Sequence, residues 1–426
     1  MLYDIGFLVF SLFYLPALIF KGKLHGDFLE RFGRFGPDKK KALEAGSGRI
    51  WIQAVSVGEV SLCRSLIPDL IKRFPGKEIV LSTITKTGND LARKLFSDHA
   101  IIIYFPLDLS AVVRKAVTVV KPSLYIMIET EIWPNLLGEL CRRDIRTILI
   151  NGRISDRSFA KYKMIKGFLR KTMEKIDLFC MQSDKDMKKI ISLGAPIDRV
   201  RVTGTMKFDT EPGSAAGPDN AGRGELGLKN GDELLVAGST HKGEEEIILS
   251  IYSRLLRDYP YVKLLLAPRH IVRVKEIDAI VRQHSFDPVR VSQISNPGRP
   301  CNHGSRPKVL ILDTIGHLKD IYSIASLVFI GGSLVDRGGQ NPIEAGVHER
   351  SVLFGPYMSN FGTVADLLIA GEGAIRIASG DDLLEKLKML LNDVSARSRL
   401  GRNARKIIME NRGATDKNIN MIEGLL

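Results

Sequence analysis

The stretch FIGGSLVDRGGQNPIEAG, residues 329–346, passes from an apolar run through two Gly-Gly pairs into the start of a helix. That order predicts one strand–loop–helix unit of an α/β fold, and a loop of this kind is a common setting for a phosphate group. The Lys-Ser/Thr ending of a Walker-type P-loop is missing. The stretch therefore indicates a ligand-binding loop that differs from a P-loop.

Two interpretations of this stretch stay open. In the first, Asn341 is the N-cap, Pro342 is the first helical residue and Glu344 stands three residues after the cap, which is a capping box. In the second, the paired glycines let backbone N–H groups approach a phosphate, while Glu344 accepts hydrogen bonds from ribose hydroxyls. Both roles are compatible at one helix start.

The same alternation of apolar runs and helix-period segments extends over most of the chain. Seven predicted strands come first, at 50–55, 78–83, 101–106, 124–129, 147–152, 178–182 and 200–204. Six more follow, at 234–239, 262–268, 308–313, 327–332, 351–356 and 374–378. Such a βα series predicts parallel sheets covered by helices on both faces.

The N-terminus begins with an uncharged run, IGFLVFSLFYLPALIF at 5–20, followed closely by Lys21, Lys23 and Arg31. It lacks the basic start and the small-residue cleavage site of a signal peptide. It is also short of the roughly 20 residues that cross a bilayer, and Pro16 interrupts it. We expect a minimal anchor or a helix at the membrane surface, and a buried N-terminal helix is the alternative.

Residues 209–231, DTEPGSAAGPDNAGRGELGLKNG, interrupt the alternation with Gly, Pro, Ala and polar residues and form the best linker candidate. We therefore expect a membrane anchor at 1–22, an N-terminal Rossmann-like domain at 23–208, and a C-terminal Rossmann-like domain with terminal helices at 232–426. The predicted fold class is α/β, with two doubly wound domains facing each other across a cleft. Ligands of such sheets bind outside the carboxyl ends of the strands.

The composition limits the classes of partner and site. Apolar residues make up 44% of the 426 residues and charged residues 26%, as in globular proteins, and the net charge of +14 favours an anionic partner such as nucleic acid, acidic lipid or a phosphorylated substrate. The four cysteines are far apart, so we interpret them as buried thiols of a reducing compartment. No metal site is predicted, because the histidines are scattered and the one clear DxD, at 184–186, follows Ser183 at a helix start.

The candidate ligand-binding residues follow the predicted strands, where a doubly wound domain binds its ligands. In the C-terminal domain they are Ser239, Thr240, Pro268, Arg269, His270, Ile315, Gly316, His317, Asn341, Pro342, Ile343 and Glu344. In the N-terminal domain they are Ser56, Gly58, Glu59, Lys86, Glu129, Glu131, Arg153 and Lys207. For Glu129 and Glu131 a catalytic role and a supporting, structural role both stay open.

Glu30 stands apart in HGDFLERFGRFG, residues 25–36, directly after the apolar run and among basic residues. A glutamate in such a setting is usually part of a surface ion pair, and it gains interest if the substrate is a lipid with a hydroxyl group to deprotonate. A second basic segment, KYKMIKGFLRK at 161–171, places Tyr162, Ile165, Phe168 and Leu169 on one face of a helix. This segment is predicted to border a membrane or acceptor phosphates, or else to be an ordinary solvated face.

Ten segments, in this order, together resemble the 3-deoxy-D-manno-octulosonic acid (Kdo) transferases of lipopolysaccharide assembly: HGDFLERFGRFG, QAVSVGEV, STITKTG, IETEIWPN, NGRISDRS, GTMKFD, GSTHKGEE, APRH, DTIGHL and GGSLVDRGGQNPIEAG. The resemblance runs from the N-terminal segment to about residue 380. It implies an inverting GT-B glycosyltransferase on the cytoplasmic face of the inner membrane. Its substrates would be CMP-Kdo and a tetraacylated, bisphosphorylated lipid A precursor, lipid IVA.

The resemblance also implies roles for particular residues. Glu30 would be the general base for the hydroxyl group of the acceptor. Three motifs would hold CMP, and they fall on 268–270, 315–317 and 341–344. His317 stands where glutamate is common in the family, which puts its contact in doubt, and Asp336 replaces a glutamate with conservation of charge.

The predicted chemistry fits these residues. A sugar hydroxyl is too weakly acidic to attack unaided, so a carboxylate must take its proton. A helix start, backbone amides, Arg269 and Lys207 would stabilise the departing CMP without a metal or cofactor, with CMP-Kdo as co-substrate. The expected partners are CMP-Kdo, the lipid A precursor and the inner membrane surface, with no nucleic acid. The alternatives are a GT-B transferase that uses a UDP-sugar, and a non-catalytic membrane-bound module that binds a nucleotide or lipid.

Overall fold

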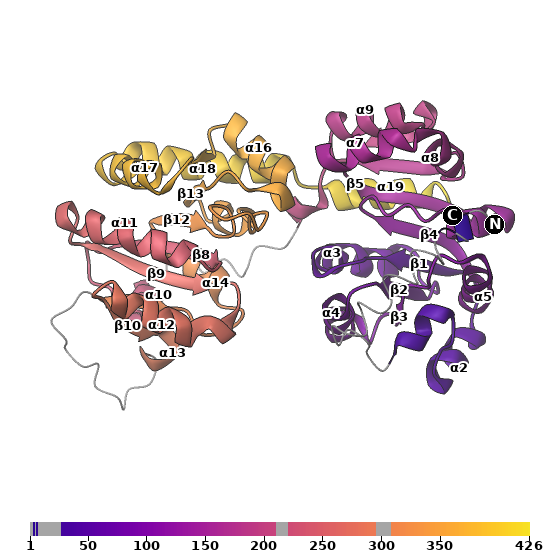
Figure 1. Ribbon diagram of the computed structural model, residues 1–426, viewed down its shortest axis with the longest axis horizontal. Coiled ribbons are helices and arrows are strands. Elements are labelled where there is room, and N and C mark those ends of the chain that lie inside the picture. Colours follow the sequence, from indigo (N-terminus) through magenta and orange to yellow (C-terminus); the bar gives the residue numbers. More distant parts are fainter. Residues whose placement is uncertain (1–2, 5, 7–26, 210–219, 295–307) are drawn as a thin grey trace. The chain divides into compact units, whose positions relative to one another are not determined.

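Two compact units make up the computed structural model, which describes residues 3–4, 6, 27–209, 220–294 and 308–426. Unit 1 comprises Met1–Thr210 together with Arg412–Leu426, and unit 2 comprises Glu211–Asn411 (Figure 1). The predicted linker at 209–231 thus includes the observed boundary. The end of the chain differs from the prediction, because its last residues belong to unit 1 and were expected in the C-terminal domain.

Unit 1 contains a parallel sheet of seven strands in the order β3-β2-β1-β4-β5-β6-β7. The strands are β1 (Arg49–Gln53), β2 (Ile79–Thr83), β3 (Ile101–Tyr104), β4 (Pro122–Ile128), β5 (Arg146–Gly152), β6 (Leu178–Met181) and β7 (Val200–Val202). Each of these seven strands overlaps one of the strands predicted from the sequence. Because the order reverses between β1 and β4, the carboxyl ends of these two strands form the switch point where doubly wound sheets bind ligands.

Helices cover both faces of this sheet. The helices of unit 1 are η1 (Phe28–Phe32), α2 (Pro37–Ala45), α3 (Val57–Arg73), α4 (Lys86–Phe96), α5 (Ser110–Val120), α6 (Pro134–Arg142), α7 (Asp156–Met164), α8 (Lys166–Met173), α9 (Asp184–Leu193), η2 (Ile197–Arg199), η3 (Met206–Asp209) and α19 (Ala414–Glu423). One core cluster joins the sheet to α3, α4 and α19, and another joins its opposite face to α5, α6, α8 and α9.

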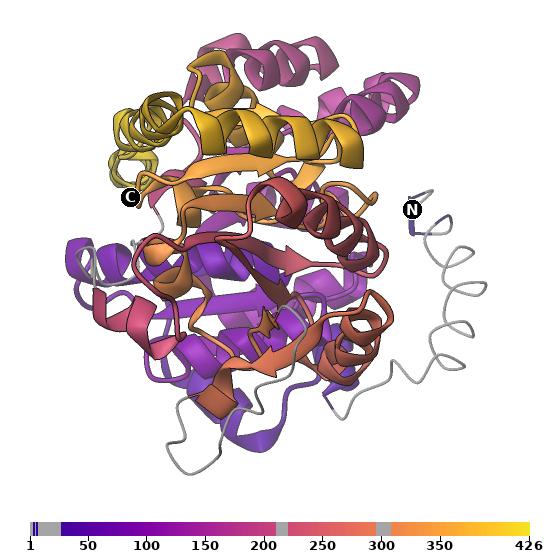
Figure 2. The same cartoon turned by 90° about the vertical axis from the view of Figure 1, so that its left-hand side faces the viewer.

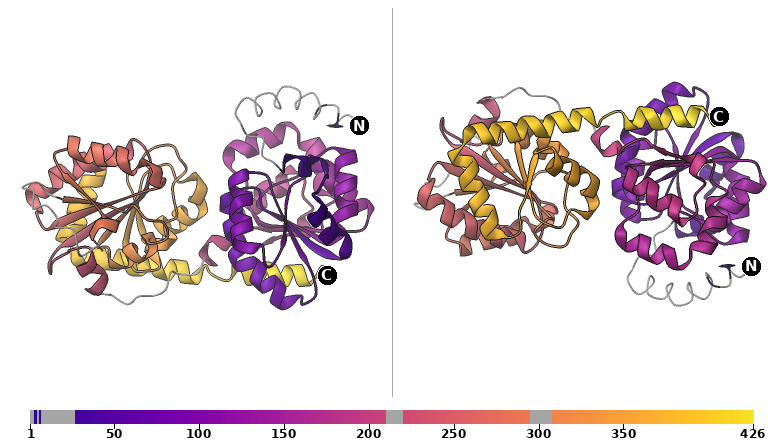
Figure 3. Two further views of the ribbon diagram at one scale, coloured as in Figure 1. Left: turned by 90° about the horizontal axis from the view of Figure 1, so that it is seen from below. Right: turned by 90° about the horizontal axis from the view of Figure 1, so that it is seen from above.

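The last helix, α19, explains why the chain end belongs to unit 1. Ile419 and Ile422 are buried in the same cluster as Leu62 and Leu66 of α3. Asp209 fixes the start of the helix, since its carboxylate accepts hydrogen bonds from the N–H groups of Gly413 and Thr415 at 2.7 and 2.6 Å. Figure 3 shows α19, in yellow, beside the other helices of this unit.

Unit 2 contains a second parallel sheet of seven strands in the order β10-β11-β9-β8-β12-β13-β14. The strands are β8 (Glu233–Thr240), β9 (Val262–Pro268), β10 (Asp287–Arg290), β11 (Lys308–Ile311), β12 (Leu327–Ile330), β13 (Ser351–Phe354) and β14 (Ala374–Arg376). Six confirm the prediction. The edge strand β10 was missed because its sequence, DPVR, is polar and its residues are all partly exposed.

Helices also cover both faces of the second sheet (Figure 2). They are α10 (Asn220–Glu225), α11 (Glu244–Asp258), η4 (Ile271–Arg273), α12 (Val274–Gln283), α13 (Val291–Ile294), α14 (Leu318–Ile324), α15 (Ile343–Gly346), η5 (Ser359–Phe361), α16 (Gly362–Ala370), α17 (Gly380–Asn392) and α18 (Val394–Glu410). The main core packs α11, α12 and α17 on one face, while α14 and α15 lie against β8 and β13. The switch point of this sheet lies between β8 and β12.

The basic segment 161–171 belongs to two helices, since the helical conformation is interrupted at Ile165, between α7 and α8. The single helical face predicted for it was therefore wrong. Leu169 packs into the core, whereas Met164, Ile165 and Phe168 are 86%, 49% and 45% exposed. These three apolar side chains lie among lysines and arginines on the surface of unit 1.

The predicted anchor at 1–22 lies outside the described residues except for Tyr3, Asp4 and Gly6. Tyr3 stacks on Phe168, with ring centroids 5.9 Å apart. The carboxylate of Asp4 accepts hydrogen bonds from the N–H and hydroxyl groups of Ser110, at 3.0 and 2.7 Å. Within the described residues, every helix is too short or too polar to span a bilayer.

The cysteines differ in part from the prediction. Cys63 and Cys180 are buried thiols, but Cys141 on α6 is exposed, and Cys301 lies outside the described residues. The DxD segment begins a helix as predicted, because the hydroxyl of Ser183 accepts the N–H of Asp186 at the start of α9.

Candidate active site

The switch point of unit 2 brings together the ends of β8 and β12. Ser239, at the end of β8, has φ +55°, a left-handed conformation that is costly for a residue with a side chain. Gly331, just after β12, lies so close that an added Cβ would stand 2.5 Å from the carbonyl oxygen of Ser239 and 2.6 Å from Cα of Thr240. This glycine is therefore required by the packing of two loops.

The N–H groups of the β12 loop converge on Glu244, the first residue of α11. Its carboxylate accepts hydrogen bonds from the N–H groups of Gly332, Ser333 and Leu334 at 2.7, 3.0 and 2.9 Å, and from that of His241 at 2.9 Å. The side chain is fully buried, and burial raises its pKa although the four donors partly offset that shift.

Three of the four glycines predicted to offer their N–H groups to a phosphate donate them within the protein instead. Glu244 takes the N–H of Gly332, while those of Gly331 and Gly339 donate to the carbonyl oxygens of Gly238 and Gly332. The part of the loop at 332–334 thus binds the carboxylate of Glu244. The glycines of the loop adopt positive φ angles or lie where two loops approach too closely for a side chain.

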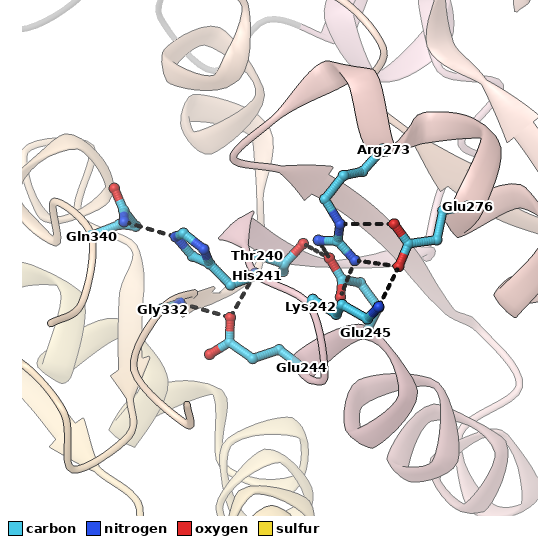
Figure 4. A network of polar contacts seen from close by, with 9 residues as sticks. All are labelled: Thr240, His241, Lys242, Glu244, Glu245, Arg273, Glu276, Gly332 and Gln340. Atoms are coloured by element: carbon cyan, nitrogen blue, oxygen red, sulfur yellow. Dashed lines mark hydrogen bonds and ion pairs between the residues drawn. The ribbon is translucent and has the colours of Figure 1, made fainter. Parts of the chain in front are cut away.

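A polar network continues from this loop into the neighbouring helices (Figure 4). The hydroxyl of Thr240 donates to Glu245 at 2.9 Å, and Arg273 forms an ion pair with the same buried carboxylate at 2.8 Å. Arg273 also contacts Glu276 at 3.2 Å. Thr240 therefore has a supporting role, since its side chain is fully buried and committed to Glu245.

The end of β9 places two of the candidate ligand-binding residues, Arg269 and His270, next to β8. Pro268 is buried and closes the strand, while Arg269 and His270 are exposed. The N–H of Arg269 donates to the carbonyl oxygen of Thr240 at 3.0 Å. The ring of His270 meets that of His241 edge to face at 5.9 Å. The main chain of Arg269 is therefore fixed by this hydrogen bond, while its exposed side chain is accessible to a ligand.

The remaining two motifs lie along the same edge. Ile315, Gly316 and His317 are exposed between β11 and α14, and β11 is the neighbour of β9. On the other side of the switch point, Asn341 donates from its side-chain amide to Glu344 at 3.2 Å.

The predicted capping arrangement at 341–344 was wrong in detail. The helix begins at Ile343, one residue later than expected, and Pro342 precedes it. The side-chain oxygen of Asn341 accepts the N–H of Ile343 at 3.1 Å. Glu344 is partly exposed and contacts the side chain of Asn341. Its predicted contact with ribose stays a prediction.

The switch point of unit 1 gathers carboxylates. Burial, followed by the charge of Glu129, raises the pKa of Glu59 to about 8 and that of Glu131 to about 7. Ser56 donates its hydroxyl to Glu59 at 3.0 Å, and the N–H of Val55 donates to the same carboxylate. Glu129 has a left-handed backbone with φ +60°. Burial raises the pKa of Glu244 as well, but four backbone N–H groups offset that shift, whereas two donors offset it at Glu59.

One cation enters this group of carboxylates. Nζ of Lys207 lies 3.8 Å from Oε1 of Glu129. Burial lowers the pKa of Lys207, the charge of Glu129 raises it, and the charge of Arg153 lowers it. The main chain of Arg153 is fixed to Thr130 by reciprocal hydrogen bonds of 3.2 and 2.6 Å. The structure therefore brings Ser56, Glu59, Glu129, Glu131, Arg153 and Lys207 together.

Two predicted residues of unit 1 lie outside this group. Lys86 is exposed at the start of α4 and lies 3.9 Å from Asp90 of the same helix. At Gly58 an added Cβ would meet nothing closer than the hydroxyl of Ser56 at 3.8 Å, so no close approach explains the glycine.

Glu30 lies over the carboxyl end of β3, in the short helix η1. Its side chain is 4% exposed, and Oε2 accepts the N–H of Tyr104 at 2.9 Å. Oε1 forms an ion pair with Lys39. The adjacent Arg31 donates to the carbonyl oxygen of Ile84 at 2.7 Å, which fixes η1 beside β2. The acid is thus held firmly at the ligand-binding edge of the first sheet.

Sequence reasoning missed five residues of the unit 2 site: His241, Glu244, Glu245, Arg273 and Gln340. Three of them stand in GSTHKGEEE, a stretch in which the sequence analysis names only Ser239 and Thr240 as candidates. Their partners are on other elements, so their roles depend on contacts that the stretch alone does not reveal.

Comparisons with known proteins agree on one family. Residues 27–210 match a family model described as 3-deoxy-D-manno-octulosonic-acid transferase (kdotransferase). The chain is 33% identical to the 3-deoxy-D-manno-octulosonic acid transferase of Haemophilus influenzae, over 88% of this chain and 87% of that protein. It is 32% identical to the transferase of the same name from Chlamydophila psittaci, over 87% of this chain and 83% of that one.

Solved structures are similar in fold. A glycosyltransferase from Rickettsia africae matches with a TM-score of 0.59 at 10% identity, covering 89% of this chain and 99% of that one. A UDP-bound MnaA of S. aureus matches with a TM-score of 0.57 at 13% identity, covering 89% and 98%. At such identities the likeness concerns the fold, which is GT-B-like with two parallel seven-stranded sheets.

Proposed function

The chain belongs to the 3-deoxy-D-manno-octulosonic acid (Kdo) transferase family, and we propose that it transfers Kdo from CMP-Kdo to a lipid A precursor with inversion at the anomeric carbon. The acceptor we propose is tetraacylated and bisphosphorylated lipid IVA. The observation that carries this proposal is the position of Glu30, a buried carboxylate held at the carboxyl edge of the first sheet in a family of glycosyltransferases.

Glu30 is the proposed general base. Its Oε2 is held by the backbone at Tyr104, so Oε1 is the oxygen that an acceptor hydroxyl would approach. Lys39 occupies that oxygen, and the hydroxyl would take the place of its ammonium group. As the new glycosidic bond forms, the carboxylate takes the hydroxyl proton, while the bond from the anomeric carbon to the phosphate of CMP breaks.

The ligand-binding edge of unit 2 is the proposed donor site. Arg269 is an exposed cation at the end of β9 and His270 is an exposed imidazole beside it, which suits the phosphate of a nucleotide sugar. Residues 315–317 and 341–344 flank them and are proposed to complete the CMP site. Charge on the departing CMP is stabilised by these groups and by Lys207, without a metal or cofactor.

Membrane attachment is the third part of the proposal. Residues 1–22 would attach the protein to the cytoplasmic face of the inner membrane, as the uncharged run at 5–20 suggests. The stacking of Tyr3 on Phe168 supports this, because it places a residue of the predicted anchor against one of the exposed apolar side chains of α8. The surrounding lysines and arginines suit an acidic membrane surface and a bisphosphorylated acceptor.

Two measurements on the full-length protein in detergent test the proposal. Thermal stabilisation should occur with CMP and be absent with UDP, and the reverse result would favour a transferase that uses a UDP-sugar. Mass analysis of the product made from CMP-Kdo and lipid IVA should then show the addition of Kdo. If CMP binds but lipid IVA stays unmodified, the chain is a nucleotide-binding module or uses another acceptor, and the proposed reaction is wrong.

A further inference from the structure

His241 occupies the centre of the donor edge in unit 2. It follows the end of β8 and contacts Gln340 of the β12 loop (Figure 4). On its other side the ring meets that of His270, at the end of β9. The side chain is partly buried. This is the switch point of the sheet, which makes a polar side chain here a candidate for ligand contact.

The structure holds this residue from three sides. Its N–H donates to the buried carboxylate of Glu244 at 2.9 Å. Its Nε2 lies 3.2 Å from the side-chain nitrogen of Gln340. Gly332 leaves the necessary room, because an added Cβ there would stand 3.1 Å from the imidazole ring. The ring is therefore positioned before any ligand arrives.

The contact with Gln340 decides which ring nitrogen carries the proton. In the assigned orientation of the Gln340 amide its nitrogen faces Nε2 of His241. An amide nitrogen can only donate, so Nε2 accepts, and this assigns the proton of the neutral ring to Nδ1. Burial, with the charges of His270, Arg337 and Arg269, lowers the pKa of His241 and favours this neutral ring. Among the described residues, Nδ1 meets no hydrogen-bond partner.

The charges around the ring suit an anion. Arg269, His270 and Arg337 are exposed on the adjoining loops. The nearest acids are already compensated, since Glu244 accepts four backbone N–H groups and Glu245 pairs with Arg273 at 2.8 Å. The edge thus presents cations and an N–H donor, while its carboxylates are committed inside the fold.

We propose that His241 is a donor-binding residue whose Nδ1–H donates a hydrogen bond to an anionic oxygen of the nucleotide sugar. Glu244 and Gln340 are its positioning residues, because they fix its main chain and its tautomer. This inference rests on the proposed function for the identity of the ligand. The anionic oxygen belongs either to the phosphate of CMP or to the carboxylate of Kdo, and the two sources are separable by experiment.

The test compares three substitutions of His241 in the full-length protein. His241→Leu removes the donor, His241→Asn places an amide nitrogen near the position of Nδ1, and His241→Gln places one near Nε2. For a phosphate contact, the Kd for CMP should rise about tenfold in the Leu and Gln variants and stay within about threefold in the Asn variant. Cytidine, which lacks the phosphate, should bind all three variants as it binds the wild type.

For a carboxylate contact, the KM for CMP-Kdo should rise in the Leu and Gln variants and stay close to the wild-type value in the Asn variant. The Kd for CMP should then stay unchanged in all three. In either case kcat should change by less than about threefold, because the contact binds the donor without taking part in proton transfer. His284→Leu, at the end of α12 in the same unit, is the matched control and should leave both constants unchanged. Unfolding midpoints equal to that of the wild type show that the fold is retained.

The inference is overturned if the Leu and Gln variants match the wild type in both constants, or if Asn is as damaging as Leu. Failure of the proposed function looks different, since the wild type itself would then bind UDP in place of CMP. In that case the same three variants are judged with UDP, and the predicted order of Leu, Gln and Asn still decides the role of His241.

Discussion

The two ligand-binding edges use buried carboxylates in opposite ways. In unit 2, Glu244 and Glu245 are fully buried, and each is compensated, one by four backbone N–H groups and the other by Arg273. In unit 1, burial raises the pKa of Glu59 to about 8 and that of Glu131 to about 7, with few donors to offset the shift. The first arrangement builds a rigid loop, and the second keeps acids that can gain or lose a proton near neutral pH.

This difference assigns separate tasks to the units. A loop whose carboxylates are committed presents its cations to solvent, which suits the binding of an anionic donor. An edge whose acids have fewer compensating donors, together with a buried Glu30, suits proton transfer from a hydroxyl group. Substitutions should therefore separate chemistry in unit 1 from donor binding in unit 2.

The largest effect is expected for Glu30→Gln. Transfer should fall by a factor on the order of 10² or more, because the amide cannot accept the hydroxyl proton. The Kd for CMP should stay unchanged, since the residues of the proposed donor site at 268–270, 315–317 and 341–344 are in the other unit. Product formation by mass analysis and CMP titration check both halves. Lys39→Met is the companion variant, because it removes the ion pair with Glu30 but keeps the carboxylate. Normal turnover by Glu30→Gln would rule out the assignment of Glu30 as the base.

Glu244→Ala should come next. It leaves four backbone N–H groups without their acceptor, which should lower the free energy of unfolding by roughly 2 kcal/mol or more. Hydrogen exchange should speed up at Gly332, Ser333 and Leu334 and stay unchanged in the strands of unit 1. Protection that stays as in the wild type at these three amides would contradict the role of Glu244 as the organiser of the loop.

Arg269→Met should weaken CMP binding about tenfold, the loss expected for one charge-assisted hydrogen bond. The exposed side chain makes a structural effect small, so the unfolding midpoint should not move. Arg254→Met on α11, an exposed arginine paired with Asp381, is the control. Calorimetric titration with CMP measures both variants, and equal affinities would remove Arg269 from the proposed donor site.

The smallest effect is a change in the pH dependence of stability. The pKa of Glu59 is raised above its unfolded value, so the folded state binds this proton more tightly, and stability should fall as pH rises from about 5 to about 8. Glu59→Gln removes this titration and should flatten the decrease, as measured by denaturant unfolding over that pH range. Glu44→Gln, at an exposed carboxylate of α2, should leave the slope as it is. An unchanged slope in Glu59→Gln would mean that this group is ionised throughout.

Much of the fold could be predicted from the sequence, since each central strand is an apolar run followed by a helix. The failures have local causes. Strand β10 is polar because it lies at an edge, and α19 joins unit 1 through Ile419 and Ile422, whose partners on α3 are some 350 residues earlier. The break at Ile165 separates two short helices that share one continuous basic pattern in the sequence.

The candidate site was predicted unevenly for the same reason. Exposed residues at strand ends, such as Arg269 and Glu30, could be named from their motifs. The role of the glycine loop could not, because its N–H groups are taken by Glu244, which precedes them by about 90 residues. His241 was passed over because its tautomer depends on Gln340 from another loop.

The sequence by itself determined two parallel α/β sheets, the loops that carry the candidate residues, and the family to which the chain belongs. These follow from local periodicity and from ordered motifs, which need no knowledge of distant contacts. The tertiary structure decided which acids are compensated and which are not. That distinction depends on desolvation and on hydrogen bonds between elements far apart in the chain, and it separates the structural Glu244 from the titratable Glu59 although both begin as glutamates beside a strand end.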